Sequence, residues 1–362
     1  MNSAGKYFAG LLTLALLFGS RAYAEPYLAV RYGLKCQSCH VNPTGGGLRK
    51  DFGDVFAQTE LPAHPIRGDW GLWTGEVTKF LRVGGDIRYN FTATATPGSN
   101  TVEQLGLQQA RVYLEGQVIP DRLILYIDEQ VAPGNALNRE AYGIYWSASH
   151  EWYVKAGQMY LPFGFRLEDQ TAFVYEVNSF NMLEPDDAVE FGWLKGHWDA
   201  QLDVSNGTFA TPSPHGKEYG LQLSYVESAW RFGIAANDDG AVQFKRRVYG
   251  LFGGTRTGPV TWLAEVDMVQ NEYSPLTGVT QAAALLEGDW LIAPGNNLKV
   301  TFEPFDPDRD VHGTGRSRWS LVYELTPVQF LQIRAGLRDY NGPRDIAAEN
   351  QRLWFIQLHG FF

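Results

Sequence analysis

The chain has 362 residues, of which 44% are hydrophobic, 14% aromatic and only 19% charged, with 39 glycines. This mixture favours many short, turn-rich strands over helices. The formal net charge of −10 argues against a nucleic-acid partner, and it is compatible with a lumen or mouth that admits cations.

The first 24 residues have the pattern of a secretory signal peptide. Lys6 supplies a basic start, residues 8–19 are apolar, and Ala22-Tyr23-Ala24 is a small-x-small cleavage site. The alternative is a membrane-anchoring helix, but about 12 apolar residues are too few to cross a ~30 Å hydrocarbon core. We therefore expect cleavage of residues 1–24, export, and a mature chain beginning at Glu25.

The two cysteines of the chain both lie in the sequence Cys36-Gln37-Ser38-Cys39-His40. Thiols at this spacing can each add to one vinyl group of a haem, and the adjacent histidine then reaches the iron. We expect one covalent haem c, with thioethers at Cys36 and Cys39 and His40 as the proximal ligand. Two alternatives stay open: a dithiol or disulfide pair, and a metal site such as zinc, for which His64 is the nearest further ligand.

Residues 25–68 form a small segment unlike the rest of the chain. Leu48, Phe52 and Phe56 recur at helical spacing, and the prolines at 62 and 65 end the predicted helix. The segment has too few apolar residues to bury a haem alone, so we expect it to dock on or inside the following domain. The distal ligand of the iron stays open: His64 is the nearest candidate in sequence, and Met159 and Met182 are the alternatives if the haem docks into the barrel.

From about residue 69 the pattern changes to period two, which predicts β-strands with one apolar and one polar face. In residues 329–338 the apolar positions are Leu331, Ile333, Ala335 and Leu337, with polar residues or glycine between them. Turn residues separate most runs and predict about sixteen strands, many near the 9–11 residues of a membrane strand. Residues 69–362 are therefore predicted to form an all-β, transmembrane antiparallel β-barrel.

A soluble β-sandwich or propeller is the competing fold. Strand length, aromatic residues near the ends of the runs and the C-terminus argue against it. Trp354, Ile356, Leu358 and the terminal Phe362 fall on one face of the last predicted strand. This ending resembles the terminal strand of bacterial outer-membrane proteins, which the barrel-assembly machinery reads.

On these features the chain resembles the fused outer-membrane cytochrome–porin family, which includes the outer-membrane iron oxidases of iron-oxidising bacteria. The resemblance covers the layout of the whole chain, and its sharpest motif is Cys36 to His40. It implies a monohaem segment joined to a porin of about sixteen strands in the outer membrane. If the chain is an enzyme, this implies an oxidoreductase whose chemistry belongs to the haem.

A second resemblance lies within the barrel. Val154 to Gly164 is similar to a strand-and-loop signature of the phosphate-selective porin family. The loop that follows, to about Asp187, is long enough to fold inward and constrict a pore; the alternative is a solvated extracellular loop.

The leading functional hypothesis is an electron conduit across the outer membrane. Its expected partners are the outer-membrane lipid, a periplasmic cytochrome or other electron carrier, and an extracellular donor or acceptor. One haem cannot bridge a ~30 Å core alone, so it must lie partway along the lumen or meet a partner there. The alternatives are a diffusion porin with a haem or disulfide plug segment, and a haem-dependent sensor or binding protein anchored by a barrel.

Overall fold

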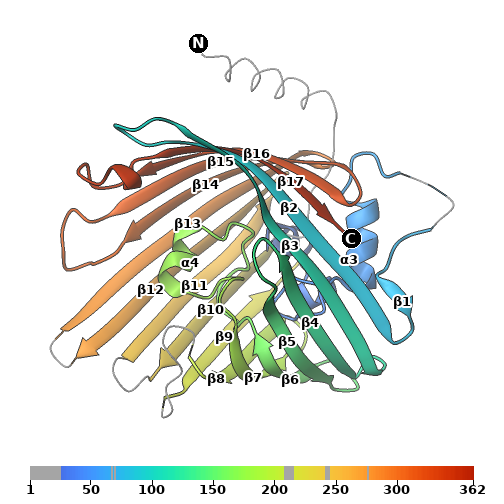
Figure 1. Cartoon of the computed structure of the whole chain (residues 1–362). Helices are drawn as coiled ribbons and strands as arrows, with labels where there is room; N and C mark the ends of the chain where they lie inside the picture. The colour runs from blue at the N-terminus through green and yellow to red at the C-terminus, as the bar shows by residue number, and fades with distance from the viewer. Residues whose placement is uncertain (1–25, 67, 69–70, 208–215, 241–244, 275–276) are drawn as a thin grey trace.

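The computed structural model describes residues 26–66, 68, 71–207, 216–240, 245–274 and 277–362. The predicted signal peptide lies outside the described residues. Within the described residues, sixteen antiparallel strands, β2 to β17, follow one another around a barrel. The barrel closes where β17 pairs with β2 (Figure 1). The prediction of an all-β antiparallel barrel of about sixteen strands is confirmed.

The strand bounds, in chain order, are β1 Glu76–Thr78, β2 Leu81–Ala95, β3 Val102–Ile119, β4 Leu123–Ala132, β5 Leu137–Trp146, β6 Trp152–Met159, β7 Asp186–Trp193, β8 Trp198–Ser205, β9 Glu218–Val226, β10 Trp230–Asp239, β11 Lys245–Thr257, β12 Val260–Ser274, β13 Thr277–Ala293, β14 Asn296–Asp306, β15 Arg316–Val328, β16 Leu331–Asn341 and β17 Arg352–Phe361. The short β1 pairs only with β2, at the start of the barrel. The helical elements are α2 Pro26–Tyr32, η1 Cys36–Ser38, α3 Asp51–Thr59, α4 Phe173–Asn178 and η2 Ala347–Glu349. Among the described residues, no helix is long and apolar enough to cross a membrane.

The two faces of each strand carry different side chains, as the period-two pattern predicts. In β16, Gln332, Arg334 and Arg338 are buried inside the barrel, whereas Leu337 is exposed on the outside. The outward positions of the other strands are likewise rich in exposed apolar residues. A closed barrel with this exterior satisfies its backbone hydrogen bonds internally and matches a hydrocarbon surround.

The connections at the two ends of the barrel differ in length. One end, here called the short-turn end, has only the connections 120–122, 147–151, 194–197, 227–229, 258–259, 294–295 and 329–330. The opposite end includes the long connections 160–185, 307–315 and 342–351. The chain terminus lies at the short-turn end, where the backbone N–H of Phe362 donates to the Gly85 carbonyl (3.0 Å).

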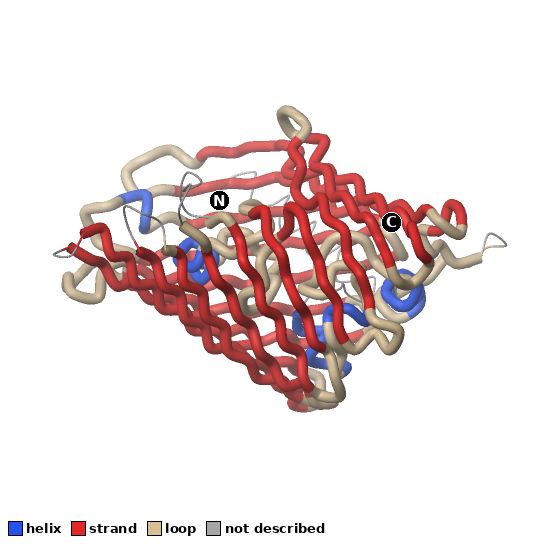
Figure 2. The backbone as a smooth tube through the Cα atoms, turned by 90° about the horizontal axis from the view of Figure 1, so that it is seen from below, coloured by secondary structure: helices blue, strands red, loops and turns tan. Residues whose placement is uncertain are grey.

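The N-terminal segment packs into the short-turn end of the barrel. Helix α2 contacts β10, β11 and β12, and the Arg31 side chain donates to the carbonyl of Pro259 in a short turn (2.9 Å). Helix α3 contains Phe52 and Phe56 of the predicted helix, whereas Leu48 precedes its first residue. This helix lies beside the C-terminus (Figures 1 and 2). The prediction that this segment docks on or inside the barrel is confirmed.

The loop between β6 and β7, residues 160–185, folds into the lumen. Its helix α4 contacts β12, β13 and β14, and Phe173, Val174 and Tyr175 are buried. Of the two alternatives for this loop, the inward one is therefore correct. We call residues 160–185 the inward loop.

If the outward side chains of the strands contact lipid, a charge placed among them should destabilise the barrel. Leu321 is exposed near the middle of β15, so Leu321→Arg places a charge in the bilayer and should destabilise the barrel by roughly 2–4 kcal/mol. Urea unfolding in lipid bilayers measures this change, with Leu321→Met as the matched apolar control. Equal stability of the two variants would contradict a lipid-facing position.

Candidate functional site

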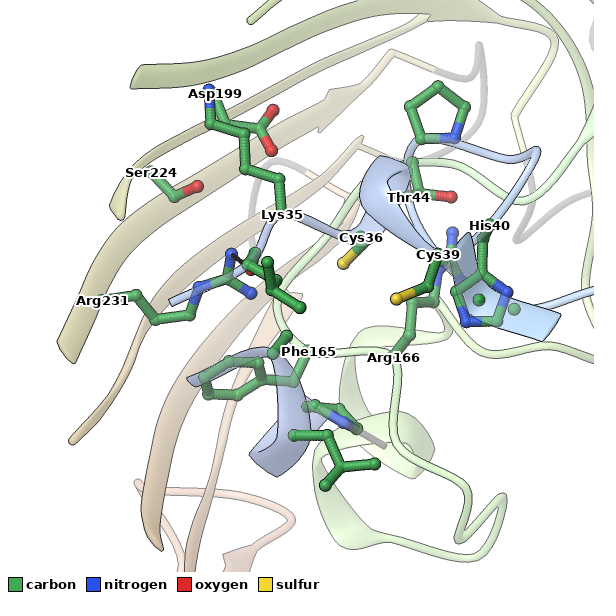
Figure 3. Close-up of a pocket in the computed structure, with 18 of the residues that line it drawn as sticks. Lys35, Cys36, Cys39, His40, Thr44, Phe165, Arg166, Asp199, Ser224 and Arg231 are labelled. Atoms are coloured by element: carbon green, nitrogen blue, oxygen red, sulfur yellow. Dashed lines mark hydrogen bonds between the residues drawn. The ribbon is translucent and has the colours of Figure 1, made fainter. Parts of the chain in front are cut away.

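The Cys-x-x-Cys-His motif forms one tight turn that brings its three functional side chains together. The backbone N–H groups of Cys39 and His40 both donate to the Cys36 carbonyl, at 3.1 and 3.0 Å. Both cysteines are free thiols in the structure, and both line the same cavity as His40 (Figure 3). The local fold of residues 36–40 therefore presents two sulfur atoms and one imidazole to a single space.

This cavity, here called the motif cavity, lies between the N-terminal segment, the barrel wall and the inward loop. The empty space within it, including the part open to solvent, is about 950 Å³. Its apolar lining consists of Pro26, Leu28, Ala29, Tyr32, Leu34, Pro43, Phe56, Leu61, Phe165 and Phe252. Its polar lining, apart from the motif, consists of Lys35, Thr44, Arg166, Asp199, Gln201, Gln222, Ser224 and Arg231.

The polar lining lies on two sides of the cavity, and Thr44 and Arg166 are beside the motif (Figure 3). Figure 3 shows Asp199, Ser224 and Arg231 on barrel strands, across the cavity from His40. Arg231 is buried, and one of its Nη atoms donates to the Leu34 carbonyl (3.3 Å). The cavity thus has a sulfur-and-imidazole side and a charged side, with apolar walls between them.

The protonation of the motif follows from its burial. Burial, together with the nearby positive charge of Arg49, lowers the pKa of His40 to about 3. The imidazole is therefore neutral at physiological pH, which is the form that binds a metal. Its Nδ1 atom is buried and has no hydrogen-bond partner among the described residues. Burial likewise raises the pKa of Cys39 to about 11, so its thiol is protonated.

A glycine turn follows the motif and lets the backbone approach the cavity. Gly45, Gly46 and Gly47 have φ values of 96°, 81° and 65°, which side-chain-bearing residues rarely adopt. A Cβ atom at Gly45 would lie 3.5 Å from the Cys36 Sγ atom. At Gly47 it would collide with the hydroxyl of Tyr126 on the barrel wall. The turn therefore requires glycine both for its backbone angles and for its close contact with the barrel.

The barrel wall holds the motif through buried polar contacts. The fully buried Asn42 side chain donates to Glu140 Oε1 of β5 (2.8 Å), and Lys155 Nζ of β6 lies 3.4 Å from Asn42 Oδ1. The Leu48 backbone N–H donates to the Tyr126 hydroxyl (3.1 Å). These contacts were not predicted. The sequence shows which strand residues are polar and face inward, but it does not show which residues of the N-terminal segment they contact.

Helix α3 supports the motif from the other side. Gly53 lies directly against the Cys39 backbone and leaves no room for a Cβ atom there. The Lys50 backbone N–H, at the helix start, donates to the Cys39 carbonyl (2.8 Å). One residue of this helix, Phe56, also lines the motif cavity, so the predicted amphipathic helix contributes both support and lining.

The three residues considered as the distal ligand lie at different places. His64 is exposed, and its backbone N–H donates to Pro327 near a short turn (3.2 Å), so it does not line the motif cavity. Met159 is buried at the end of β6 and does not line this cavity either. Met182 lines a neighbouring cavity of about 800 Å³ that also borders His40 and Gly46. Among the described residues, no group of three or more histidine, cysteine or acidic side chains is arranged to hold a metal ion.

The inward loop closes the motif cavity on the lumen side. The Phe165 backbone N–H donates to Glu265 Oε2 of β12 (2.9 Å), and Phe165 and Arg166 line the cavity. Phe165 also packs edge-on against Phe252 of β11, with ring centroids 5.2 Å apart. The inward loop is thus held against β11 and β12, which are distant from it in sequence, and forms one wall of the site.

Ion pairs fix the inward loop to the opposite wall. Asp169 lies 2.8 Å from Arg318 of β15 and 2.8 Å from Arg338 of β16. Burial alone raises the pKa of Asp169, but the two arginines outweigh it and lower the pKa below its usual range. Its stabilising contribution is therefore complete above the ordinary aspartate pKa and is lost as the pH falls through its lowered value.

Asp169→Asn should loosen the inward loop. The substitution removes the charge that Arg318 and Arg338 share, at a cost of about 1.5–3 kcal/mol. We expect faster trypsin cleavage at Arg166 in the folded barrel, because this arginine is buried in the loop. The control is Glu176→Gln, which breaks a more exposed pair with Arg316 (3.0 Å). Equal cleavage of both variants would contradict the claim that the ion pairs of Asp169 hold the inward loop in place.

Neither a protein-family model nor a curated protein sequence matches the chain. Solved structures do match. An anion-selective porin from Comamonas acidovorans aligns with a TM-score of 0.64 at 10% identity, covering 78% of this chain and 99% of the porin. The outer-membrane channel DcaP of Acinetobacter baumannii has a TM-score of 0.59 at 12% identity, with coverages of 78% and 97%. OprB of Pseudomonas putida has a TM-score of 0.59 at 9% identity, with coverages of 78% and 94%.

These likenesses confirm the fold of a porin-like barrel. Together with the apolar exterior of the strands, this fold places the chain in the bacterial outer membrane, in contact with lipid. The predicted localisation and the lipid contact are thus confirmed, whereas the haem, its ligands and the electron carriers stay predictions.

Proposed function

We propose that this chain is an outer-membrane cytochrome–porin that carries one covalent haem c and passes electrons across the outer membrane. The observation that carries the proposal is the convergence of Cys36, Cys39 and His40 on one cavity inside the barrel. Short turns face the periplasm in barrels of this kind. The motif cavity therefore belongs to the periplasmic part of the lumen.

The residues of the motif cavity fit a haem in their chemistry. Its apolar walls suit the faces of a flat macrocycle. The buried, unpartnered Nδ1 and the neutral state of His40 suit an iron ligand. Lys35 and Arg231 on the charged side suit the two carboxylates of a haem.

Each group of this chain has a distinct role in the proposal. Cys36 and Cys39 would each form a thioether by adding S–H across one vinyl C=C, with the hydrogen going to the other vinyl carbon. His40 would hold the iron, and Asn42 keeps the motif against the wall through Glu140. The apolar lining and the inward loop limit the access of water. A bound haem would supply reversible one-electron chemistry.

The barrel determines which partners can reach the site. The N-terminal segment faces the periplasm, where a soluble cytochrome or another electron carrier would exchange electrons. A donor or acceptor from outside would enter from the long-loop end as far as the inward loop. The protein wall excludes lipid from this path.

A diffusion porin with a plug is the second candidate function. The observation that favours it is the occupation of the short-turn end by residues 26–66 and of the lumen by the inward loop. In that function the N-terminal segment is a plug, and its two thiols carry a haem or form a disulfide. A large ionic conductance together with an electrochemically silent cofactor would favour it over the conduit.

Covalent attachment is tested with the purified wild-type chain from a host that attaches haem c. Wild type should retain a haem band on denaturing gels, because two thioethers survive unfolding. Cys36→Ala and Cys39→Ala should lose or strongly weaken the band, whereas Ser38→Ala, within the same motif, should keep it. Wild type without covalent haem would overturn the proposal.

Electron passage is tested in proteoliposomes that hold the haem-loaded chain. After reduction, the haem should be oxidised by a membrane-impermeant acceptor added to the side of the long loops, because the lumen leads to the motif cavity. Oxidation only from the side of the short turns would contradict the conduit and favour the plugged porin.

A further inference from the structure

The periplasmic mouth of the barrel carries an exposed aromatic surface directly outside the motif cavity. Tyr32, Phe56 and Phe52 form a continuous row of rings, here called the aromatic row. Tyr32 and Phe56 meet edge-on with centroids 5.2 Å apart, and Phe56 stacks on Phe52 at 6.1 Å. Tyr32 is 43% exposed and Phe52 is 50% exposed.

A surface groove adjoins this row. The groove, here called the rim groove, has a volume of about 660 Å³ and lies against the short turn between β13 and β14. Leu28, Tyr32 and Leu61 of the N-terminal segment form one side, and residues 291–294 form the other. Glu60 is the one charged residue in its described lining. The mouth therefore presents an apolar surface at the short-turn end of the barrel.

The wall between this surface and the motif cavity is one side chain thick. Leu28, Tyr32 and Leu61 line both the rim groove and the motif cavity. Phe56, at the centre of the aromatic row, also lines the motif cavity. The same side chains thus contact the proposed haem on one face and the outside on the other.

We propose that the aromatic row and the rim groove together form the docking site for a soluble one-electron carrier protein whose own cofactor edge is surrounded by apolar residues. This inference rests on the proposed function and names where one of its partners binds. Exposed apolar patches of limited size mark interaction sites, and transient electron-transfer complexes bury small areas. Such a complex requires a thin wall between the two cofactors, and Leu28, Tyr32 and Leu61 provide one because they line both the motif cavity and the rim groove.

The choice of occupant follows from the position of the surface. Leu28, Tyr32 and Leu61 of this surface belong to the N-terminal segment in the mouth, whereas Ile292 lies near the end of β13 on the same outward side as Trp290. A second copy of this chain, docked mouth to mouth, would leave the motif cavity facing another cavity of the same kind and would not deliver electrons to a soluble carrier. A carrier protein accounts for both the exposed rings and the shared wall.

The test measures electron exchange between the haem-loaded chain in nanodiscs and a soluble monohaem cytochrome c by stopped-flow spectroscopy. Phe52→Ser and Ile292→Ser change residues of the surface that do not line the motif cavity. Each should lower the second-order rate constant about tenfold, as expected for a central interface residue. Val77→Ser, which alters an equally exposed residue of β1 outside the groove, should leave the rate constant unchanged.

Two further readouts separate the possible failures. Haem content and reduction by dithionite should be the same in all variants, and wild type without haem would overturn the proposed function and this inference with it. Full haem content with equal rate constants in all variants would overturn the docking site alone. Self-association of the wild type that Phe52→Ser abolishes, seen by sedimentation in detergent, would assign the surface to a second copy instead.

Discussion

The structure depends on the insertion of a small, motif-bearing segment into the mouth of a membrane barrel. Residues 26–66 cannot bury a cofactor alone, because they have too few apolar side chains. The barrel supplies what is missing: Asn42 is held by Glu140, and Leu48 by Tyr126. These buried hydrogen bonds fix the register of the segment, since leaving any of their partners unpaired would cost about 1–3 kcal/mol.

The inward loop completes the same enclosure from the lumen. It would be costly to hold residues 160–185 across a water-filled space without anchors, because each ordered residue loses about 1–2 kcal/mol of conformational entropy. Anchors on two strands, β12 and β15, offset this loss: Glu265 accepts from Phe165, Asp267 from Asn178, and Asp169 pairs with Arg318. The cavity is therefore made of parts that no single stretch of sequence contains.

This division explains how much could be predicted from the sequence. The barrel could be predicted, because alternation such as that from Leu331 to Leu337 is local and repeats along the chain. The motif residues could be named because their chemistry depends on spacing alone. Arg231 and Phe252 could not, because their place opposite the motif depends on pairing between strands far apart in sequence. His64 was the nearest candidate ligand in sequence, but it is exposed, and its backbone N–H donates to the Pro327 carbonyl near a short turn.

The central claim is that the barrel encloses a haem attached to its own N-terminal segment. Peptide mass spectrometry of the purified wild-type chain tests it most directly, because the fragment containing residues 36–40 reports the state of both thiols. We expect this fragment with the mass of one haem added and no free thiol. The same fragment with two free thiols, or with a disulfide between Cys36 and Cys39, would contradict it.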